Sequence, residues 1–560
     1  MLAQQQLQTM LSATHEVTNQ PPPLVGYNLF TQDAALAEGV QREGAGWAEE
    51  RLEELGRLAG SERAIQWGFD ANTSLPALKT HDRYGHRIDE VVFHPAWHQL
   101  MTTAVTWGMH AGPWREPRRG AHVARAAAFF LWGQVEGGHG CPISMTYAAV
   151  PALRVQPEVA AVWEPRLMSL EYDPGLRPPA EKRGILAGMG MTEKQGGSDV
   201  RANTTRAELL GAGGPGGEYV LTGHKWFCSA PMCDVFLMLA QAPGGLSCFL
   251  VPRVLPDGTR NNFFIQRLKD KLGNKSNASS EIELNHAWAL LLGEEGRGVR
   301  TIVEMVNYTR LDCIGGTASV MRQAVAQATH HAAHRIAFGK RLIEQPLMRQ
   351  VLADLAIESE AATMLLLRLA RACDGALAAD AQEAHIKRIG TAIGKYWVCK
   401  RGPAHVAEAL ECLGGNGYVE ESIMPRLYRE SPLNSIWEGA GNVNCLDVLR
   451  AMTREPETVE AYFQELALAR GADARLDAAV ARLKAELADH QNMEVRARRL
   501  VEQMALALQG SLLVQHSHSA VADAFCASRL GGDWGVAFGT LPAGIDAAAI
   551  VSRARPNAAN

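Results

Sequence analysis

Residues 190–199 read Gly190-Met191-Thr192-Glu193-Lys194-Gln195-Gly196-Gly197-Ser198-Asp199. The glycines of this segment allow backbone N–H groups to approach an anion, and the hydroxyls of Thr192 and Ser198 add donors that suit phosphate or flavin oxygens. Taken alone, such a segment is more often a solvated loop. Its meaning depends on the sequence around it.

The segment lies at the start of a strand-rich region. From about Gly184 onward, short apolar runs are separated by glycine, proline and asparagine, which is typical of strands and turns. The runs cover residues 219–221, 235–239, 247–252, 263–268 and 281–284. They predict a small, mostly antiparallel β-domain.

Helical patterns flank this region on both sides. Apolar residues recur at helical spacing from Asp33 to about Val162, and again in long runs at 300–333 and 349–374 whose lengths suit a bundle. Pro21-Pro22-Pro23 predicts an extended arm, of a kind that often packs on a neighbouring subunit. We therefore expect a mainly α protein with a central β-domain, in five parts: an arm (1–32), an N-terminal helical domain (33–184), a middle β-domain (185–298), a helical bundle (299–454) and a C-terminal helical domain (455–560).

Composition narrows the class of protein. The 560 residues carry a formal net charge of -5, which gives no overall attraction to nucleic acid or anionic membranes. The 10 cysteines form no CxxC pair, and no apolar run reaches the roughly 18 residues of a membrane span. His330, His331 and His334 share one predicted helix, but no carboxylate or cysteine set completes a metal site, so we interpret them as exposed helix residues. We expect a cytoplasmic enzyme without a metal ion or a membrane anchor.

Residues 190–199 form the first of two sequence signatures that occur in the order expected for one protein family. Residues 191–199 resemble the Met/Leu-Thr-Glu-x-x-x-Gly-Ser-Asp loop of the acyl-CoA dehydrogenase family. A second family signature runs from Glu411 through Gly414, Gly415, Gly417 and Tyr418 to Glu421, Arg426 and Glu430. The glycines at 414–417 follow a helical stretch rather than a strand, which excludes a Rossmann NAD site. The resemblance implies the family's fold, a helical domain, an antiparallel β-domain and a four-helix bundle, with an extra C-terminal helical domain.

The resemblance also implies FAD as the cofactor. In the family the first loop holds FAD, a Trp-Ile-Thr segment similar to residues 226–228 stands beside the flavin, and the glycine turn and the Arg335 segment reach the FAD of a neighbouring subunit. It assigns cofactor binding to Met189, Met191, Thr192, Gly197, Ser198, Trp226, Phe227, Cys228, Ser229, Arg335, Phe338, Gln345, Glu411, Gly414, Gly415, Gly417, Ala440 and Asn442. Two positions depart from the pattern. Glu411 replaces a glutamine and loses its donor, and Cys228 replaces a threonine, so Ser229 or a backbone amide is the alternative donor.

Residues 435–442 resemble the family segment in which a glutamate removes the α-proton of an acyl-CoA thioester. Glu438 is therefore the expected base, with Arg310, Trp437 and Gly439 on the substrate side. Desolvation beside Trp437 would raise the pKa of the carboxylate and its basicity. Some branches of the family place the base instead at the position of Thr309, which cannot serve because threonine is not a base. Without the family context, a capping or ion-paired carboxylate is the commoner role for such a glutamate.

Three further stretches, Arg42–Trp47, Phe93–His98 and Leu268–Asn274, resemble the branch of the family that acts in the bacterial adaptive response to DNA alkylation. That branch implies a homotetramer, a dimer of dimers with FAD at the subunit interface, which binds double-stranded DNA and dehydrogenates isovaleryl-CoA-like substrates weakly.

From Glu455 onward there are ten Lys/Arg against thirteen Asp/Glu, so Arg496, Arg498 and Arg499 form the best local candidate for DNA contact. Three alternatives stay open: a housekeeping acyl-CoA dehydrogenase of fatty-acid or branched-chain amino-acid breakdown, a non-catalytic DNA-shielding or regulatory flavoprotein, and an enzyme that oxidises nitroalkanes or other small electrophiles.

Overall fold

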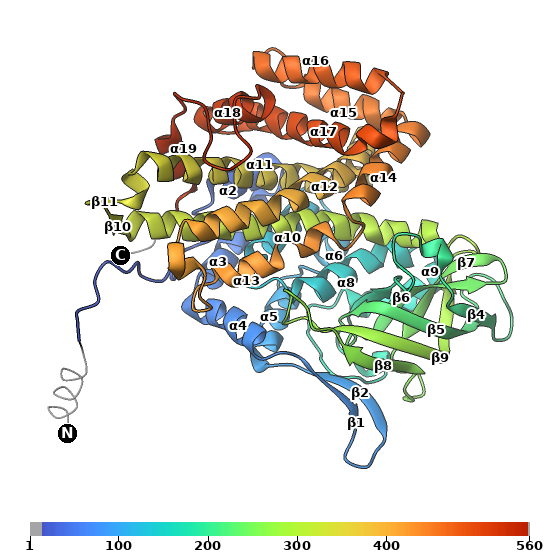
Figure 1. Cartoon of the computed structure of the whole chain (residues 1–560). Helices are drawn as coiled ribbons and strands as arrows, with labels where there is room; N and C mark the ends of the chain where they lie inside the picture. Colours follow the sequence, from blue (N-terminus) through green and yellow to red (C-terminus); the bar gives the residue numbers. More distant parts are fainter. Residues whose placement is uncertain (1–13, 558–560) are drawn as a thin grey trace, which may run out of the picture.

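The chain folds into a helical part, a strand-rich part, a long helical bundle and a further helical layer, as Figure 1 shows for the computed structural model, which describes residues 14–557. In the first part, Asp33 and Ser61 accept hydrogen bonds from the backbone N–H groups of Leu36 and Ala64, and so cap two helices. The helices of this part are α2 (Ala34–Arg42), α3 (Glu49–Ala59), α4 (Glu62–Thr73), α5 (Pro95–Thr106), α6 (Gly112–Arg115), α7 (Ala121–Gly133), α8 (Gly140–Leu153) and α9 (Pro157–Leu167), with short 3-10 turns at Gly46–Ala48 and Pro179–Glu181.

A β-hairpin interrupts this part, so the prediction of helical structure throughout Asp33–Val162 is wrong at residues 77–92. Strands β1 (Ala77–His81) and β2 (Arg87–Val92) pair antiparallel. The Asp82 carboxylate closes the turn by accepting hydrogen bonds from the backbone N–H groups of Tyr84 and His86. In the middle of β2, the Asp89 carboxylate accepts a hydrogen bond from the backbone N–H of Ile265, which fixes the hairpin to the β-domain. This tertiary contact outweighs the helical pattern of the flanking sequence.

The strand-rich part is a seven-stranded sheet that is mostly antiparallel, as predicted. Its strands are β3 (Ala187–Gly190), β4 (Arg206–Leu209), β5 (Glu218–Ser229), β6 (Val235–Ala242), β7 (Gly245–Pro252), β8 (Phe263–Leu268) and β9 (Ser279–Leu292), with a 3-10 turn at Val200–Ala202. Pairings run β6–β4–β5–β9–β7 and return to β6, so these strands close into a barrel-like ring. Only β3–β6 and β4–β6 pair parallel.

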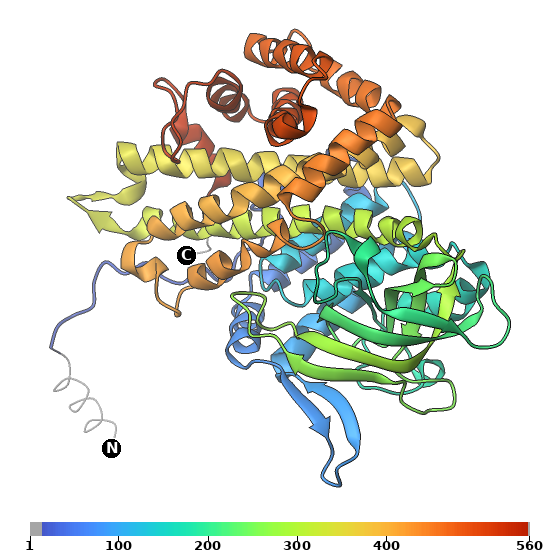
Figure 2. The ribbon, with the colours of Figure 1, turned by 45° about the vertical axis from the view of Figure 1, so that its right-hand side comes forward.

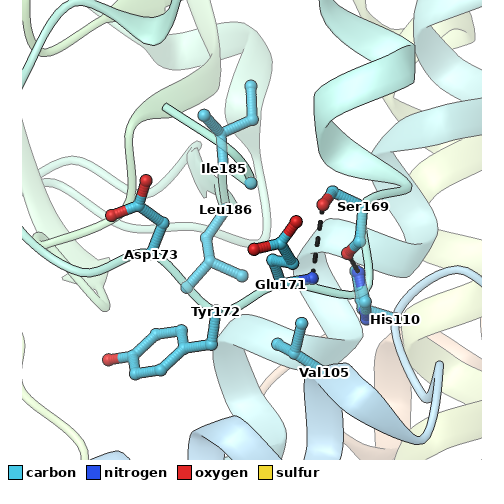
Figure 3. A pocket seen from close by; sticks show the side chains of 9 residues that line it. Val105, His110, Ser169, Glu171, Tyr172, Asp173, Ile185 and Leu186 are labelled. Atoms are coloured by element: carbon cyan, nitrogen blue, oxygen red, sulfur yellow. Dashed lines mark hydrogen bonds between the residues drawn. The ribbon is translucent and has the colours of Figure 1, made fainter. Parts of the chain in front are cut away.

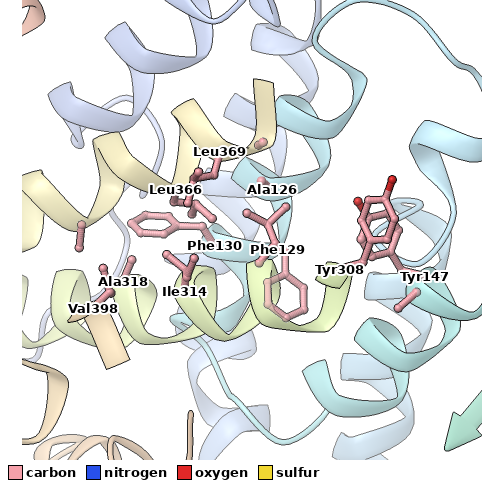
Figure 4. Packing of buried hydrophobic residues seen from close by; sticks show 14 of the residues in the cluster. Ala126, Phe129, Phe130, Tyr147, Tyr308, Ile314, Ala318, Leu366, Leu369 and Val398 are labelled. Carbon is pink, nitrogen blue, oxygen red and sulfur yellow. The ribbon is translucent and has the colours of Figure 1, made fainter. Parts of the chain in front are cut away.

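The bundle is built from α10 (Gly298–His334), α11 (Pro346–Leu377), α12 (Ala381–Glu411) and α14 (Gly441–Arg454). Shorter elements connect them: β10 (Ile336–Ala337), β11 (Lys340–Arg341), α13 (Met424–Glu430), and the 3-10 turns η4 (Leu342–Glu344), η5 (Gly414–Gly417) and η6 (Leu433–Ser435). Figure 4 shows Phe129 and Phe130 of α7 packed against Ile314, Leu366 and Val398 of the three longest helices. One continuous core therefore joins the first helical part to the bundle.

The C-terminal residues form a layer over α11 and α12, seen at the top of Figure 2. Its elements are α15 (Glu457–Ala467), α16 (Ala474–Ala488), α17 (Met493–His516), α18 (Ser519–Phe525), a π-helical turn η7 (Cys526–Leu530) and α19 (Ala547–Ala554). The fully buried Arg529 of η7 pairs with Asp354 at 2.5 Å and Glu358 at 2.9 Å, both on α11. An uncompensated buried charge would be costly, so this network ties the layer firmly to the bundle. No helix within residues 14–557 is long and apolar enough to cross a membrane.

Candidate active site

Glu438 lies on a tight turn between η6 and α14. Its φ is +58° and that of Gly439 is +92°, so two consecutive residues adopt the left-handed conformation, which is rare for a glutamate. Backbone strain of this kind persists only where neighbouring groups hold it, and it is common at functional sites. The turn is therefore a specific feature of the fold and not a passive connection.

Side chains from three bundle helices hold this turn. The Lys395 ammonium on α12 donates hydrogen bonds to the carbonyl of Trp437 at 2.8 Å and to that of Gly439. Arg310 on α10 donates from Nε to the Glu438 carbonyl at 3.0 Å, and the Asn444 amide donates to the Gly439 carbonyl. Three polar side chains thus saturate the carbonyls of the turn and fix the direction of the Glu438 side chain.

The Glu438 carboxylate accepts a 2.7 Å hydrogen bond from the hydroxyl of Thr309 on α10. Burial raises the pKa of Glu438, although Thr309, Lys395 and Arg310 act in the opposite direction. Protein atoms surround the carboxyl group, yet the residue keeps partial access to solvent. A carboxylate of raised basicity is suited to proton abstraction.

The structure thus brings the family's two alternative base positions, Glu438 and Thr309, into contact. The sequence excluded Thr309 as a base but did not reveal its role as the hydrogen-bond donor to Glu438. Lys395 was also missed. A lysine in the middle of the apolar pattern of α12 was its only signal, because a buried ammonium needs partners.

The other expected substrate-side residues lie around this turn. Arg310 forms a 2.7 Å ion pair with Asp447 of α14, so its guanidinium is used to fix the turn. The Trp437 indole is half-buried and donates to Asn434 at 2.8 Å. Gly439 has little free space, since an added Cβ would come within 3.0 Å of Val443. Ala440 and Asn442, expected to bind cofactor, follow directly at the exposed start of α14.

The loop at 190–199 and strand β5 meet through a backbone hydrogen bond from Trp226 to the Thr192 carbonyl, 2.8 Å long. Glu193 is the internal anchor of the loop. It is fully buried and accepts hydrogen bonds from Lys225 at 2.8 Å and from the Thr205 hydroxyl at 2.6 Å. Burial opposes ionisation of Glu193, but these donors hold its pKa well below the ordinary range. The anchored stem leaves the far side of the loop, including Gly197 and Ser198, exposed to solvent, while Met189, Met191 and Thr192 are half-buried.

The end of β5 shows which side chains are accessible. A register shift between Lys225 and Cys228 breaks the strand alternation, so Trp226 is half-buried, Phe227 is exposed and Cys228 is fully buried. Burial raises the pKa of the Cys228 thiol to about 12. Ser229 is half-buried and is therefore the more accessible of the two side-chain donors considered at this position. The Cys141 thiol of α8 lies near both Ser229 and Glu438, so the β-domain, the first helices and the turn converge here.

The remaining expected cofactor residues lie at the other end of the bundle. Thr309 lies within α10 and Arg335 directly follows its last residue. At a rise of 1.5 Å per residue, the two are separated by roughly 39 Å along the helix. Figure 1 places the β10–β11 hairpin far from the β-domain. The near cluster consists of the loop at 190–199, Trp226, Ser229, Ala440 and Asn442. One FAD molecule cannot reach both this cluster and the far cluster of the same chain. The far cluster consists of Arg335, Phe338, Gln345, Glu411, Gly414, Gly415 and Gly417.

The far cluster presents an open surface. Phe338 is 97% exposed and has a φ of +52°, so a bulky aromatic ring is held outward in a strained turn. Tyr418 beside the glycine turn is 81% exposed, and an added Cβ at Gly414 or Gly415 would meet no atom within 4 Å. Gln345 instead donates to the Ala337 carbonyl and braces the hairpin. An aromatic ring beside open backbone and a guanidinium fits the adenine and pyrophosphate of FAD.

Two groups of residues chosen from the sequence have different surroundings from those expected. His330 and His331 are buried, which corrects their interpretation as exposed helix residues. His330 donates to the Pro22 carbonyl at 2.8 Å, so it is a packing residue under the N-terminal arm.

The arginine patch of α17 is largely engaged within the chain. Arg499 pairs with Glu486 at 2.8 Å, Arg496 lies 3.8 Å from the same carboxylate, and Arg498 donates to the Asn442 side chain at 2.8 Å.

A separate small pocket lies between α5, the segment after α9 and the start of β3, and Figure 3 shows its lining. The buried His110 is hydrogen-bonded to the Ser169 carbonyl at 2.8 Å, and burial lowers its pKa to about 4, so it is neutral at physiological pH. The other labelled lining residues are Val105, Glu171, Tyr172, Asp173, Ile185 and Leu186. None of the expected site residues lines this pocket, and it plays no part in the site around Glu438.

Comparison with known protein families matches three segments of the chain. Residues 19–174 match the adaptive response protein AidB N-terminal domain, residues 188–287 the acyl-CoA dehydrogenase middle domain, and residues 296–453 the acyl-CoA dehydrogenase C-terminal domain. The matches follow one another along the chain in the order of the helical, strand-rich and bundle parts.

Individual relatives agree with these matches. The chain is 49% identical over 515 residues to the putative acyl-CoA dehydrogenase AidB of Escherichia coli, covering 92% of this chain and 94% of that protein. The crystal structure of Caenorhabditis elegans ACDH-11 in complex with C11-CoA superposes with a TM-score of 0.84 at 27% identity, covering 93% and 95% of the two chains. A Bacillus anthracis acyl-CoA dehydrogenase complexed with FAD shares the fold, with a TM-score of 0.60 at 21% identity and 78% coverage of each chain.

Proposed function

The chain belongs to the acyl-CoA dehydrogenase family, whose members are FAD-dependent oxidoreductases acting on CH–CH groups, and we propose that Glu438 is the base that removes the α-proton of an acyl-CoA thioester. The observation that carries this proposal is the geometry of the carboxylate. It is held on a strained turn and oriented by Thr309, burial raises its pKa, and the residue as a whole keeps partial access to solvent. A capping or merely ion-paired glutamate would need none of these features together.

The groups around Glu438 have separate roles in the proposed reaction. Lys395, Arg310 and Asn444 engage the carbonyls of the turn, and the backbone N–H of Glu438 would polarise the thioester carbonyl. FAD, when bound, supplies the acceptor for the β-hydrogen, which leaves as hydride. In the near cluster, the loop at 190–199, Trp226 and Ser229 would hold the flavin end of the cofactor. The Glu438 carboxyl receives the α-proton, which completes the balance of the dehydrogenation.

The decisive experiment is anaerobic titration of the purified yellow protein with a panel of acyl-CoA esters, including isovaleryl-CoA and the C11-CoA bound by the nematode relative. We expect bleaching of the flavin with at least one ester. The Glu438→Gln variant should retain FAD and lose about 10²- to 10⁴-fold in reduction rate. Glu283→Gln, which removes an exposed carboxylate of β9, is the matched control. A colourless protein that takes up no FAD, or a Glu438→Gln variant that reduces flavin at the normal rate, would refute the proposal.

We further propose a homotetramer, a dimer of dimers, with FAD at the subunit interface. The separation of the two clusters along α10 and the exposed Phe338 and Tyr418 of the far cluster support this arrangement. The far cluster of one subunit would complete the cofactor site of its neighbour. Light scattering should then give four times the 60.7 kDa chain mass, and dilution to monomers should release FAD. A monomer that keeps its flavin would contradict this arrangement.

Participation in the adaptive response to DNA alkylation, with binding of double-stranded DNA in the cytoplasm, is a second proposal that rests on the 49% identity to AidB. The Arg499 side chain is 70% exposed, against 23% for Arg496, so it is well placed to contact phosphates. Gel shifts with duplex DNA should weaken steeply with salt, and Arg499→Gln should reduce the salt slope by about one. Arg83→Gln, at the tip of the β1–β2 hairpin, is the control. Retardation that does not depend on salt or on Arg499 would count against this surface.

A further inference from the structure

The N-terminal arm crosses the far cluster and contacts two of its segments with adjacent residues. The Asn19 side chain donates from Nδ2 to the Ile336 carbonyl and accepts from the Ile336 backbone N–H, each at 2.8 Å. The Asn19 carbonyl accepts a 2.6 Å hydrogen bond from Nη1 of Arg335. One residue of the arm therefore makes three hydrogen bonds to the segment that leads into the Phe338 turn.

The next residues extend this contact. The Asn416 side chain, inside the glycine turn η5, donates to the Gln20 side chain at 2.9 Å. His330 of α10 donates to the Pro22 carbonyl at 2.8 Å. The described portion of the arm binds its own chain, and its packing on a neighbouring subunit stays a prediction. The arm thus connects the Arg335 segment and the glycine turn η5, which are distant in sequence and both belong to the far cluster.

The conformation of Asn19 shows that this contact is specific. Its φ is +58°, a left-handed conformation that asparagine tolerates better than most residues apart from glycine. Turned this way, the side chain offers one donor and one acceptor to a single residue, as a neighbouring strand would. Among residues 14–557, Arg335 forms no ion pair with a carboxylate, and the neutral carbonyl of Asn19 accepts a hydrogen bond from its Nη1. The other N–H donors of the guanidinium remain free for phosphate oxygens.

We propose that Asn19 is a positioning residue for the cofactor: it fixes the Arg335 guanidinium and the Phe338 turn in the orientation that receives the pyrophosphate end of FAD. This rests on the proposed function, since the far cluster must bind FAD for the arm to act on it. Through Asn19 and Gln20 the arm clamps both cofactor-facing segments of the far cluster. Its integrity therefore determines how tightly the flavin is retained.

The test is the dissociation constant of FAD, measured by calorimetric titration of the flavin-free full-length protein. Asn19→Gly keeps the left-handed backbone free of strain but removes both side-chain hydrogen bonds, and it should weaken FAD binding by about tenfold. Val17→Ala, at a neighbouring exposed position of the arm, should bind like the unmodified chain. Arg335→Lys should weaken binding by itself. Combining it with Asn19→Gly should add little further loss, because the Asn19 side chain holds Ile336, the neighbour of Arg335, and so acts on FAD through the position of the Arg335 guanidinium.

A merely structural arm gives a different pattern. Asn19→Gly would then lower the thermal unfolding midpoint of the flavin-free protein and leave the FAD dissociation constant unchanged, which would overturn the proposal. Fully additive losses from Asn19→Gly and Arg335→Lys would overturn the action through Arg335. If the unmodified chain binds no FAD, the proposed function and this inference both fail. If it binds FAD and Asn19→Gly binds equally well, only the role of the arm fails.

Discussion

Replacing Thr309 by valine removes the one hydroxyl that donates to the Glu438 carboxylate and leaves the shape of the side chain almost unchanged. The bond is 2.7 Å long, and Thr309 is buried, so water cannot readily replace the lost donor. Hydrogen bonds to charged groups contribute about 1.5–3 kcal/mol, and 1.4 kcal/mol corresponds to about one pKa unit. Because Glu438 keeps partial solvent access, we take the lower end of that range and expect an upward pKa shift of about one unit.

The sign of the effect follows from the role of the group. Glu438 acts as a base only when ionised, so flavin reduction should rise with pH through its pKa, which burial already raises. Loss of the Thr309 donor disfavours the charged form and moves this rise to higher pH. The assay is the anaerobic rate of flavin reduction by a saturating acyl-CoA ester between pH 5 and pH 10, with the FAD absorbance spectrum as a check on folding.

The predicted pattern is a shift of the midpoint by about one pH unit with a similar rate at the high-pH plateau. Thr309→Ser retains the hydroxyl and should keep the original midpoint. A Thr309→Val variant with an unchanged midpoint would refute the argument that this hydroxyl tunes the base. A uniform loss of rate at every pH would show that Thr309 orients the site without affecting the ionisation of Glu438.

Three further substitutions test the framework of the site. Lys395→Met should cost about 2 kcal/mol in urea unfolding, because two carbonyls of the Glu438 turn lose their buried donor. Glu193→Gln should cost about 3 kcal/mol at neutral pH, since it leaves the Lys225 ammonium buried without its counter-charge. Lys225 and the hydrogen bonds lower the pKa of Glu193, so the ionised carboxylate stabilises the folded chain above the ordinary carboxyl pKa. This stabilisation is lost as the pH falls below about 4. The free energy of unfolding of the variant should therefore depend less on pH in the acid range. Arg529→Met should destabilise the chain by about 3–5 kcal/mol and expose the C-terminal layer to limited proteolysis, because Asp354 is left buried and unpaired; equal proteolysis of the variant and the unmodified chain would argue against that docking role.

The sequence alone was sufficient for the family, the order of the parts and five strands of the β-domain, whereas the short strands β3 and β4 were not predicted. These conclusions depend on local properties: the spacing of apolar residues, the glycine and proline breaks, and two signatures whose residues lie close together along the chain. The β1–β2 hairpin was missed because its stability depends on a contact with Ile265, which no local pattern can show. His330 and His331 were misplaced for the same reason, since burial depends on tertiary contacts such as that of His330 with the Pro22 carbonyl of the N-terminal arm.

The arrangement of the candidate site was decided by tertiary structure. Thr309 and Glu438 are 129 residues apart, and the hydrogen bond between them exists only because α10 and the turn before α14 pack side by side. Likewise, the separation of the expected cofactor residues into two clusters follows from the length of a single straight helix. Residue identity determines which chemistry is available, because a carboxylate or a guanidinium acts through its own functional groups. Packing determines which of these groups meet, how dry their surroundings are, and hence the pKa at which Glu438 can act as a base.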